Sequence, residues 1–320
     1  MALVTATRYN TLRQSVTNVL ETGSGDSGYG QTAGSSNINA GDLITAAQIN
    51  NIYEDIRKCY KHQNGGNPAS NQLQQVNAGD LVKDNDGVNY SGWDQYEALA
   101  LNISTNRLTV AGGQQAIATA SSRTRGSWNG DINLVLDVTF ADADARRYFF
   151  NQGGFIRLTS TVSGGSSKDS DWNTMLSGAG NVDFKAHATT ASGGSGTASG
   201  SIGSYELTTS YQYIYQRFDG GTGAYSANDY YIEAQAPNDT TIKFRLVWRD
   251  QAGGNIDESV SNLSYQAITG TATTDIIGTA PGVIAVSYTH LRAHETPEHL
   301  VWRRRGEKKK GGGGGGGGGG

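Results

Sequence analysis

The clearest hydrophobic pattern lies near the middle of the chain. Apolar side chains occupy every second position over residues 132–140, and Ile156, Leu158 and Val162 share one face with Ser160 in a second stretch. This alternation is typical of strands with one buried face. Between them, Asp142 is placed to cap a short helix over residues 143–152, and two glycines follow it. The pattern predicts a strand, a short helix and a second strand.

The N-terminal part has a helical pattern instead. Apolar residues at spacings of three and four predict helices over residues 5–22 and 45–62, and Thr45 with Gln48 forms a capping box. A third short helix is predicted over 94–103. The apolar stripes are narrow, so each needs a partner, either the other helix or a helix of another subunit. The candidate helix–helix contacts are Leu12, Val16, Val19, Ile49, Ile52 and Ile56.

Short strands and polar turns dominate the second half of the sequence. A loop over residues 164–170 leads to a predicted short helix over 171–177, which Asp171 can cap. Residues rich in Gly, Ser and Thr after His187 predict a mobile loop. Further strands are predicted over residues 210–218, 230–236, 241–250 and 260–269.

These elements predict an α+β protein with two parts. A short N-terminal α-helical region over residues 1–112 precedes an antiparallel β-sandwich over 113–285. The sequence Asn-Ala-Gly-Asp-Leu occurs at 39–43 and again at 77–81. Two copies do not make a solenoid, so we interpret them as a reused turn.

The last segment differs in composition from everything before it. Residues 286–320 contain VSYTHLRAHET, a basic cluster and ten terminal glycines, which resemble a translated sequencing adapter followed by empty reads. We predict that this tail is disordered and absent from the natural product; the alternative is a basic, flexible tail.

Charge and composition narrow the function classes. The tail from Ser287 holds 7 of the 25 basic and 3 of the 29 acidic residues, which leaves a body with a net charge of about −8. Such a body repels phosphate backbones, so no nucleic-acid partner is expected. Neither a signal peptide nor a membrane span is predicted, and the single cysteine, Cys59, fits assembly in a reducing cytoplasm.

Several segments carry a resemblance to a known group of proteins. ARRYFFNQGGFIRLT with DWNTML, TRYNTLRQSV with LETGSGDSGYGQ, and YSANDYYIEA with DESV resemble virion structural proteins of tailed bacteriophages, particularly contractile-tailed marine phages. The resemblance covers roughly residues 1–285 and brings no catalytic residues. It implies a non-enzymatic particle component, located in the virion, with other virion proteins as partners. A homotrimer is expected by analogy with fibres.

Candidate catalytic and metal-binding motifs are weak. Gly-Asp-Ser-Gly at 25–28 is similar to the nucleophile loop of trypsin-like serine proteases, but the histidines lack that family's context. Residues 83–87 do not place carboxylates where a calcium loop requires them. The acid pairs Asp169 with Asp171 and Asp257 with Glu258 are expected to be structural rather than glycosidase carboxylates. We predict no catalytic residue, cofactor or metal.

A tyrosine row offers the one candidate binding surface. Tyr211, Tyr213 and Tyr215 are predicted to share one strand face, where the rings can contact another subunit or stack on a host surface glycan. Three function classes therefore stay open: a structural part of tail, baseplate or fibre, a glycan-binding fibre module, and a depolymerising enzyme. Capsid decoration is a further structural alternative.

Overall fold

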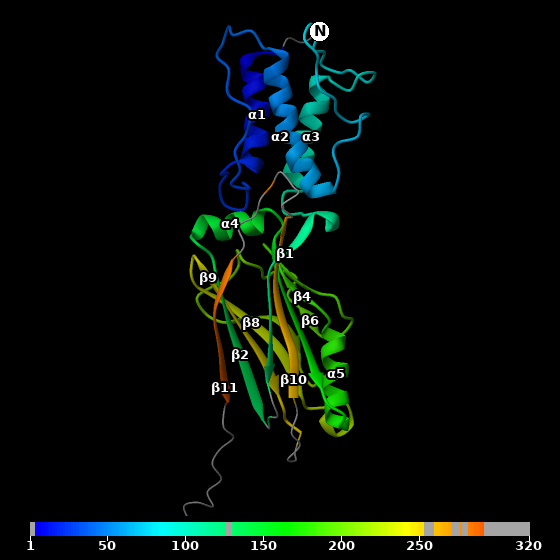
Figure 1. Ribbon diagram of the computed structural model, residues 1–320, viewed down its shortest axis with the longest axis vertical. Helices are drawn as coiled ribbons and strands as arrows, with labels where there is room; N and C mark the ends of the chain where they lie inside the picture. Colours follow the sequence, from blue (N-terminus) through cyan, green and yellow to red (C-terminus); the bar gives the residue numbers. More distant parts are fainter. Residues whose placement is uncertain are drawn as a thin grey trace, which may run out of the picture.

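The computed structural model describes residues 4–125, 128, 130–252, 259–270, 276 and 281–290. The molecule is elongated, with the helical part at one end and the sheets at the other (Figure 1). Both sheets are antiparallel and follow the helical part in the sequence. The predicted α+β class is confirmed.

Three helices form the N-terminal part: α1 (Ala6–Leu20), α2 (Ala46–Asn64) and α3 (Trp93–Thr105). Each begins where the sequence supplies a start signal. The Thr5 side chain accepts a hydrogen bond from the amide of Arg8, and the predicted capping box of Thr45 and Gln48 is present. Gly65 ends α2 in the left-handed conformation, with φ of 88°.

All three helices run in the same direction. At their first turns, the Tyr9 hydroxyl donates to the carbonyl of Gln48, and Arg8 pairs with Glu97. At their last turns, the Gln63 side chain donates to the carbonyl of Ile103. Parallel helices cannot be joined by short turns, so the segments 21–45 and 65–92 each return along the length of the bundle (Figure 1).

The apolar stripes of these helices meet inside this chain. One buried cluster also includes Tyr9, Trp93, Tyr96 and Ile103, so α3 completes the core that α1 and α2 begin. The partner that each narrow stripe requires is therefore intramolecular, and the alternative of a helix from another subunit is not needed. The six predicted contacts are all buried in this cluster: Leu12, Val16, Val19, Ile49, Ile52 and Ile56.

The β part has two layers. The strand order is β1-β10-β3-β4-β5 in one sheet and β11-β2-β9-β8-β7-β6 in the other. The short helices η1 (Gly112–Gln114), η2 (Gly223–Tyr225), α4 (Ala143–Asn151) and α5 (Ser167–Ala179) accompany them. The strands are β1 (Gln115–Arg125), β2 (Asp131–Thr139), β3 (Phe155–Ser163), β4 (Val182–Phe184), β5 (Thr189–Ala191), β6 (Thr197–Ala198), β7 (Gln212–Arg217), β8 (Asp229–Asn238), β9 (Thr241–Arg249), β10 (Ser259–Gly270) and β11 (Gly282–His290).

The sandwich core follows the predicted alternation. Every second residue of β2 is buried, and its register places Leu136 opposite Phe244 of β9. Phe184 of β4 meets Phe244 from the other layer with ring centroids 5.2 Å apart. Phe149 and Phe150 of α4 join the same cluster, and α4 lies across the end of the sheets that faces the helices (Figure 1). Truncating one such buried ring to alanine costs about 3–5 kcal/mol.

Helix α5 differs from its prediction. It begins at Ser167, capped by a box of Ser166 and Asp169, and it ends before Gly180. Asp171 therefore lies inside the helix and is not its cap. Its carboxylate instead accepts hydrogen bonds from the amide and hydroxyl of Thr222, 2.8 and 2.6 Å away.

The Gly- and Ser-rich segment after His187 is also more ordered than predicted. It contains β5 and β6, and the amides of Gly193 and Ser195 donate to the carbonyls of Ala179 and Gly178 at the end of α5. A Cβ atom on Gly193 would lie 2.0 Å from the carbonyl oxygen of Gly178. The glycines permit this close approach, so low complexity here reflects tight packing against α5.

The C-terminal prediction is corrected in its first residues. β11 continues to His290 and pairs with β2, with Val286 opposite Leu136 and Tyr288 opposite Leu134. The expectation of disorder from residue 286 is therefore wrong for 286–290, because these β-forming residues extend the sheet at its edge. Residues 291–320 lie outside the described residues.

The buried pair Lys168–Asp250 gives a stability prediction. The Lys168 ammonium contacts the Asp250 carboxylate, and both side chains are almost fully buried. Lys168→Met should lower the free energy of unfolding by about 3–5 kcal/mol, because it leaves a buried charge without its counter-ion. Lys168→Met/Asp250→Asn should recover much of that loss, because the charge is removed as well. Urea denaturation of the three proteins measures this, and a double variant as unstable as the single one would contradict the explanation.

Candidate functional site

The three candidate tyrosines do not form one row. The pairing of β7 with β8 shifts register between Tyr213 and Tyr215, and both Ile214 and Tyr215 are buried. Tyr213 is 42% exposed, whereas Tyr215 is fully buried and its hydroxyl donates to the carbonyl of Ser195 at 2.7 Å. The prediction of a shared face is therefore wrong, because an irregularity in a strand changes the face of the sheet to which the following side chains point.

A different set of rings gathers on the outer side of this sheet. Tyr213, Phe218 and Tyr231 contact one another, with centroid distances of 5.8, 5.4 and 5.6 Å for the three pairs. Phe218 is exposed, while Tyr231 lies beneath the other two rings. Neither Phe218 nor Tyr231 is among the residues predicted from the sequence for a binding surface. The adjacent pair Tyr230-Tyr231 was the available signal, since neighbouring residues of a strand point to opposite faces.

Two arginines extend this surface. The Arg245 guanidinium lies 4.2 Å above the ring of half-buried Tyr211, and that of Arg249 lies 5.4 Å from the ring of Tyr231. Both belong to cross-strand ion pairs: Arg245 with Glu233 at 2.5 Å, and Arg249 with Asp131 at 3.2 Å. We call this set the aromatic face; it consists of Tyr211, Tyr213, Phe218, Tyr231, Arg245 and Arg249.

The aromatic face has the chemistry of a contact surface. Exposed rings supply flat apolar area, and the arginines and their carboxylates supply hydrogen-bonding groups beside it. A hollow of about 410 Å³ borders Phe218 and is lined also by Gln216, Arg217 and Asp219. An apolar plane next to polar groups suits a sugar ring or the polar surface of another subunit.

The loop at residues 25–29 is a structural contact rather than a nucleophile loop. The Asn151 side-chain amide, buried at the end of α4, donates to the carbonyls of Gly25, Ser27 and Gly28 at 3.3, 2.7 and 3.0 Å. The neighbouring Gln152 side chain donates to the carbonyl of Tyr29 at 2.9 Å. The loop thereby joins the helical part to the β part.

His62 completes the same junction. Its ring is buried at the end of α2, and Nε2 donates to the carbonyl of Gln152 at 2.7 Å. Burial lowers the pKa of His62, and this effect outweighs the opposing effect of the hydrogen bond. The imidazole is therefore held neutral, as a fixed donor between the two parts.

The second histidine of this region is held between two carboxylates. His187 places Nδ1 2.7 Å from Glu206 and Nε2 3.3 Å from Asp26. Burial raises the pKa of Asp26, but hydrogen bonds from Arg107 and His187 outweigh it and leave that pKa lowered. Both nitrogens of His187 are engaged, and the hydroxyl of Ser27 bonds to Ser24. The histidines thus do not activate Ser27, which agrees with the structural interpretation of Gly-Asp-Ser-Gly.

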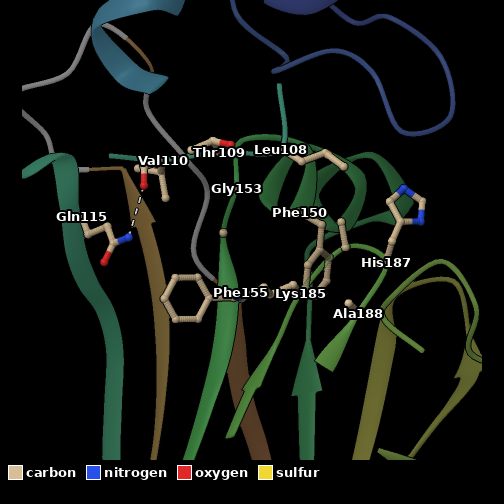
Figure 2. Close-up of a pocket in the computed structure, with 12 residues that line it drawn as sticks. Leu108, Thr109, Val110, Gln115, Phe150, Gly153, Phe155, Lys185, His187 and Ala188 are labelled. Atoms are coloured by element: carbon tan, nitrogen blue, oxygen red, sulfur yellow. Dashed lines mark hydrogen bonds between the residues drawn. The ribbon is translucent and has the colours of Figure 1, made fainter. Parts of the chain in front are cut away.

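A cavity lies next to the junction, and Figure 2 shows its lining. Its volume is about 350 Å³, and its walls include Leu108, Phe150 and Phe155. Phe155 stands on one side and His187 on the other. The cavity offers apolar contact, but its imidazole is already committed to Asp26 and Glu206, so we assign no reaction to it.

The remaining candidate carboxylates have structural partners. Asp169 caps α5 and Asp171 anchors Thr222, whereas Asp257 and Glu258 lie outside the described residues. Asp86 of the calcium-like segment accepts the amides of residues 88 and 89. Among the described residues, no group of three or more His, Cys, Asp or Glu side chains is arranged to hold a metal ion.

Comparison with family models, curated proteins and solved structures finds no match for this chain. Within the described ranges, none of the helices has the length and apolar character required to cross a bilayer.

The buried imidazole predicts a pH dependence of stability. The unfolded state takes up a proton near the ordinary histidine pKa of 6.5, whereas the folded state resists it. The free energy of unfolding should therefore fall as the pH drops below 6.5, by up to about 1.4 kcal/mol per pH unit. Denaturant unfolding at several pH values measures this slope.

A matched pair of variants assigns the slope to His62. His62→Gln should flatten it, since glutamine can donate a hydrogen bond but does not titrate. His187→Gln should leave the His62 contribution in place. An unchanged slope in His62→Gln would show that another group causes the pH dependence.

Proposed function

We propose that this protein is a non-enzymatic structural component of a tailed bacteriophage particle, in the tail, baseplate or fibre. The observation that carries the proposal is the shape of the molecule. It is elongated, and hydrogen bonds join its helical part to its β part (Figure 1). A rod with a fixed geometry and two chemically different ends suits a spacer between other proteins. The sequence resemblance to virion structural proteins adds support.

The candidate catalytic groups add support of a different kind. Asp169, Asp171, His62 and His187 each serve a cap, a loop anchor or the junction. Their hydrogen bonds hold the fold together, and we propose that these groups serve the structure rather than proton transfer.

The assembly partners in this proposal are other virion proteins. Because the helix stripes are covered within the chain, they no longer argue for oligomerisation. A homotrimer and a capsid decoration role therefore depend on analogy alone, and the aromatic face is one described surface whose chemistry suits a sister subunit.

Purified particles test the proposed location. Mass spectrometry of gradient-purified phage should detect peptides from residues 4–252 at the stoichiometry of a structural protein. The product found in infected cells but missing from finished particles would contradict the proposal. Shortening of a polysaccharide by the purified protein would contradict its non-enzymatic character.

The aromatic face favours a second candidate, a module that binds a host surface glycan. On this hypothesis Tyr213→Ala should weaken glycan binding about 2- to 10-fold, the range expected for one lost aromatic contact. Leu101→Ala, which alters an exposed apolar residue on α3, is the matched control and should bind normally. A glycan array without hits for the wild-type protein would remove this candidate.

A further inference from the structure

The repeated sequence Asn-Ala-Gly-Asp-Leu forms the same turn twice. In the first copy, the Asn39 amide donates to the Asp42 carboxylate at 2.8 Å, and the Asp42 amide donates to the Asn39 carbonyl at 3.1 Å. In the second copy, Asn77 and Asp80 make the same bonds at 2.7 and 3.1 Å. The glycine of each copy has φ of 92°. Each turn is thus fixed by its own aspartate and glycine.

Each turn ends in a leucine whose side chain is exposed to solvent. Leu43 is 84% exposed and Leu81 is 63% exposed. The two turns border one groove of about 700 Å³ at the start of α1 and α2, the end of the molecule farthest from the sheets (Figure 1). The apolar residues that line it are Val4, Ala6, Ala40, Leu43, Ile44, Ile49, Leu81 and Val82. Two rigid turns that present leucines beside an apolar groove indicate a contact with something outside the described chain.

The charge around the groove determines which kind of partner can bind there. Asp42 and Asp80 line the groove and are exposed, and among the described residues that line it none is basic. The two turns, the connection over residues 82–92 and the starts of α1 and α3 together carry six acidic residues against two basic ones: Asp42, Asp80, Asp84, Asp86, Asp94 and Glu97 against Arg8 and Lys83.

The helix dipoles do not reverse this sign. All three helix N-termini lie at this end, and each adds roughly half a positive charge. Together they offset only part of the acidic excess of four. The end of the molecule therefore keeps a negative potential around an apolar groove.

We propose that this groove binds a segment of another particle protein that carries apolar side chains flanked by lysine or arginine. The proposal deepens the structural role proposed above, on which the identity of the partner as a particle protein rests. A second copy of this chain on the same face would bring the acidic rims together, which like charges disfavour. The groove takes the apolar anchor, and the aspartates of the two turns pair with the flanking cations.

A labelled peptide tests the groove directly. The probe is a fluorescent short peptide of leucine and lysine at helical spacing, with a second peptide in which glutamate replaces every lysine. Fluorescence anisotropy with the full chain should show binding of the lysine peptide only. Leu43→Ser/Leu81→Ser should weaken that binding at least about tenfold, equivalent to about 1.4 kcal/mol. Val88→Ser/Leu101→Ser alters exposed apolar residues outside the groove and should have no effect.

A charge variant separates the two parts of the recognition. Asp42→Asn/Asp80→Asn keeps an oxygen that accepts the turn hydrogen bond but removes the charge. It should weaken the lysine peptide and flatten the salt dependence of its binding, because surface charges are screened over about 10 Å at 0.1 M salt. Circular dichroism should show that all variants fold like the wild type.

Three results would overturn the proposal. The first is equal binding of the two peptides, and the second is an equal loss in Val88→Ser/Leu101→Ser. The third is a wild-type dimer in sedimentation velocity that Leu43→Ser/Leu81→Ser converts to a monomer, which would make a second copy the occupant. If the protein binds the lysine peptide but is missing from purified particles, only the proposed phage role is contradicted. If the protein is found in particles but does not bind the lysine peptide, only the proposed binding groove is contradicted.

Discussion

The arrangement of this protein depends on the hydrogen bonds between the end of α4 and the loop at residues 25–29. Asn151 and Gln152 are buried there and together donate to four backbone carbonyls of the loop. A buried carbonyl without a donor costs about 1–3 kcal/mol, so these side chains make the contact between the two parts specific as well as close. His62 adds a donor from the opposite direction. These hydrogen bonds fix how the two parts pack against each other.

Sequence patterns predicted the elements well where one physical effect dominated. The alternation of β2 and the capping box of α2 need only local information, and both are present. The bulge that separates Tyr213 from Tyr215 has no local signal, because it depends on how β7 meets β8. The packing of Gly193 against α5 was missed for a similar reason: composition describes a segment alone, whereas its neighbours decide whether it is ordered.

The candidate surfaces were harder to predict than the fold. The aromatic face combines residues of β7, β8 and β9 with Phe218, and only the register brings Arg249 beside Tyr231. The repeated Asn-Ala-Gly-Asp-Leu was visible in the sequence, but its two copies became one surface only when the parallel helices placed both turns at the same end. In both cases the sequence showed which residue types were present, but the topology of the chain determined which of them lie together.

The parallel course of the three helices has a consequence for which parts of the chain tolerate change. In an up-and-down bundle the connections are short, and insertions there are commonly harmless. Here the connections over residues 21–45 and 65–92 span the whole bundle. The first contains both the loop that is hydrogen-bonded to the end of α4 and one of the two leucine turns. Shortening these connections would remove the attachments at both ends while leaving the helices themselves intact. The connections are thus the constrained part of this region, and the exposed sides of the helices are the part free to vary.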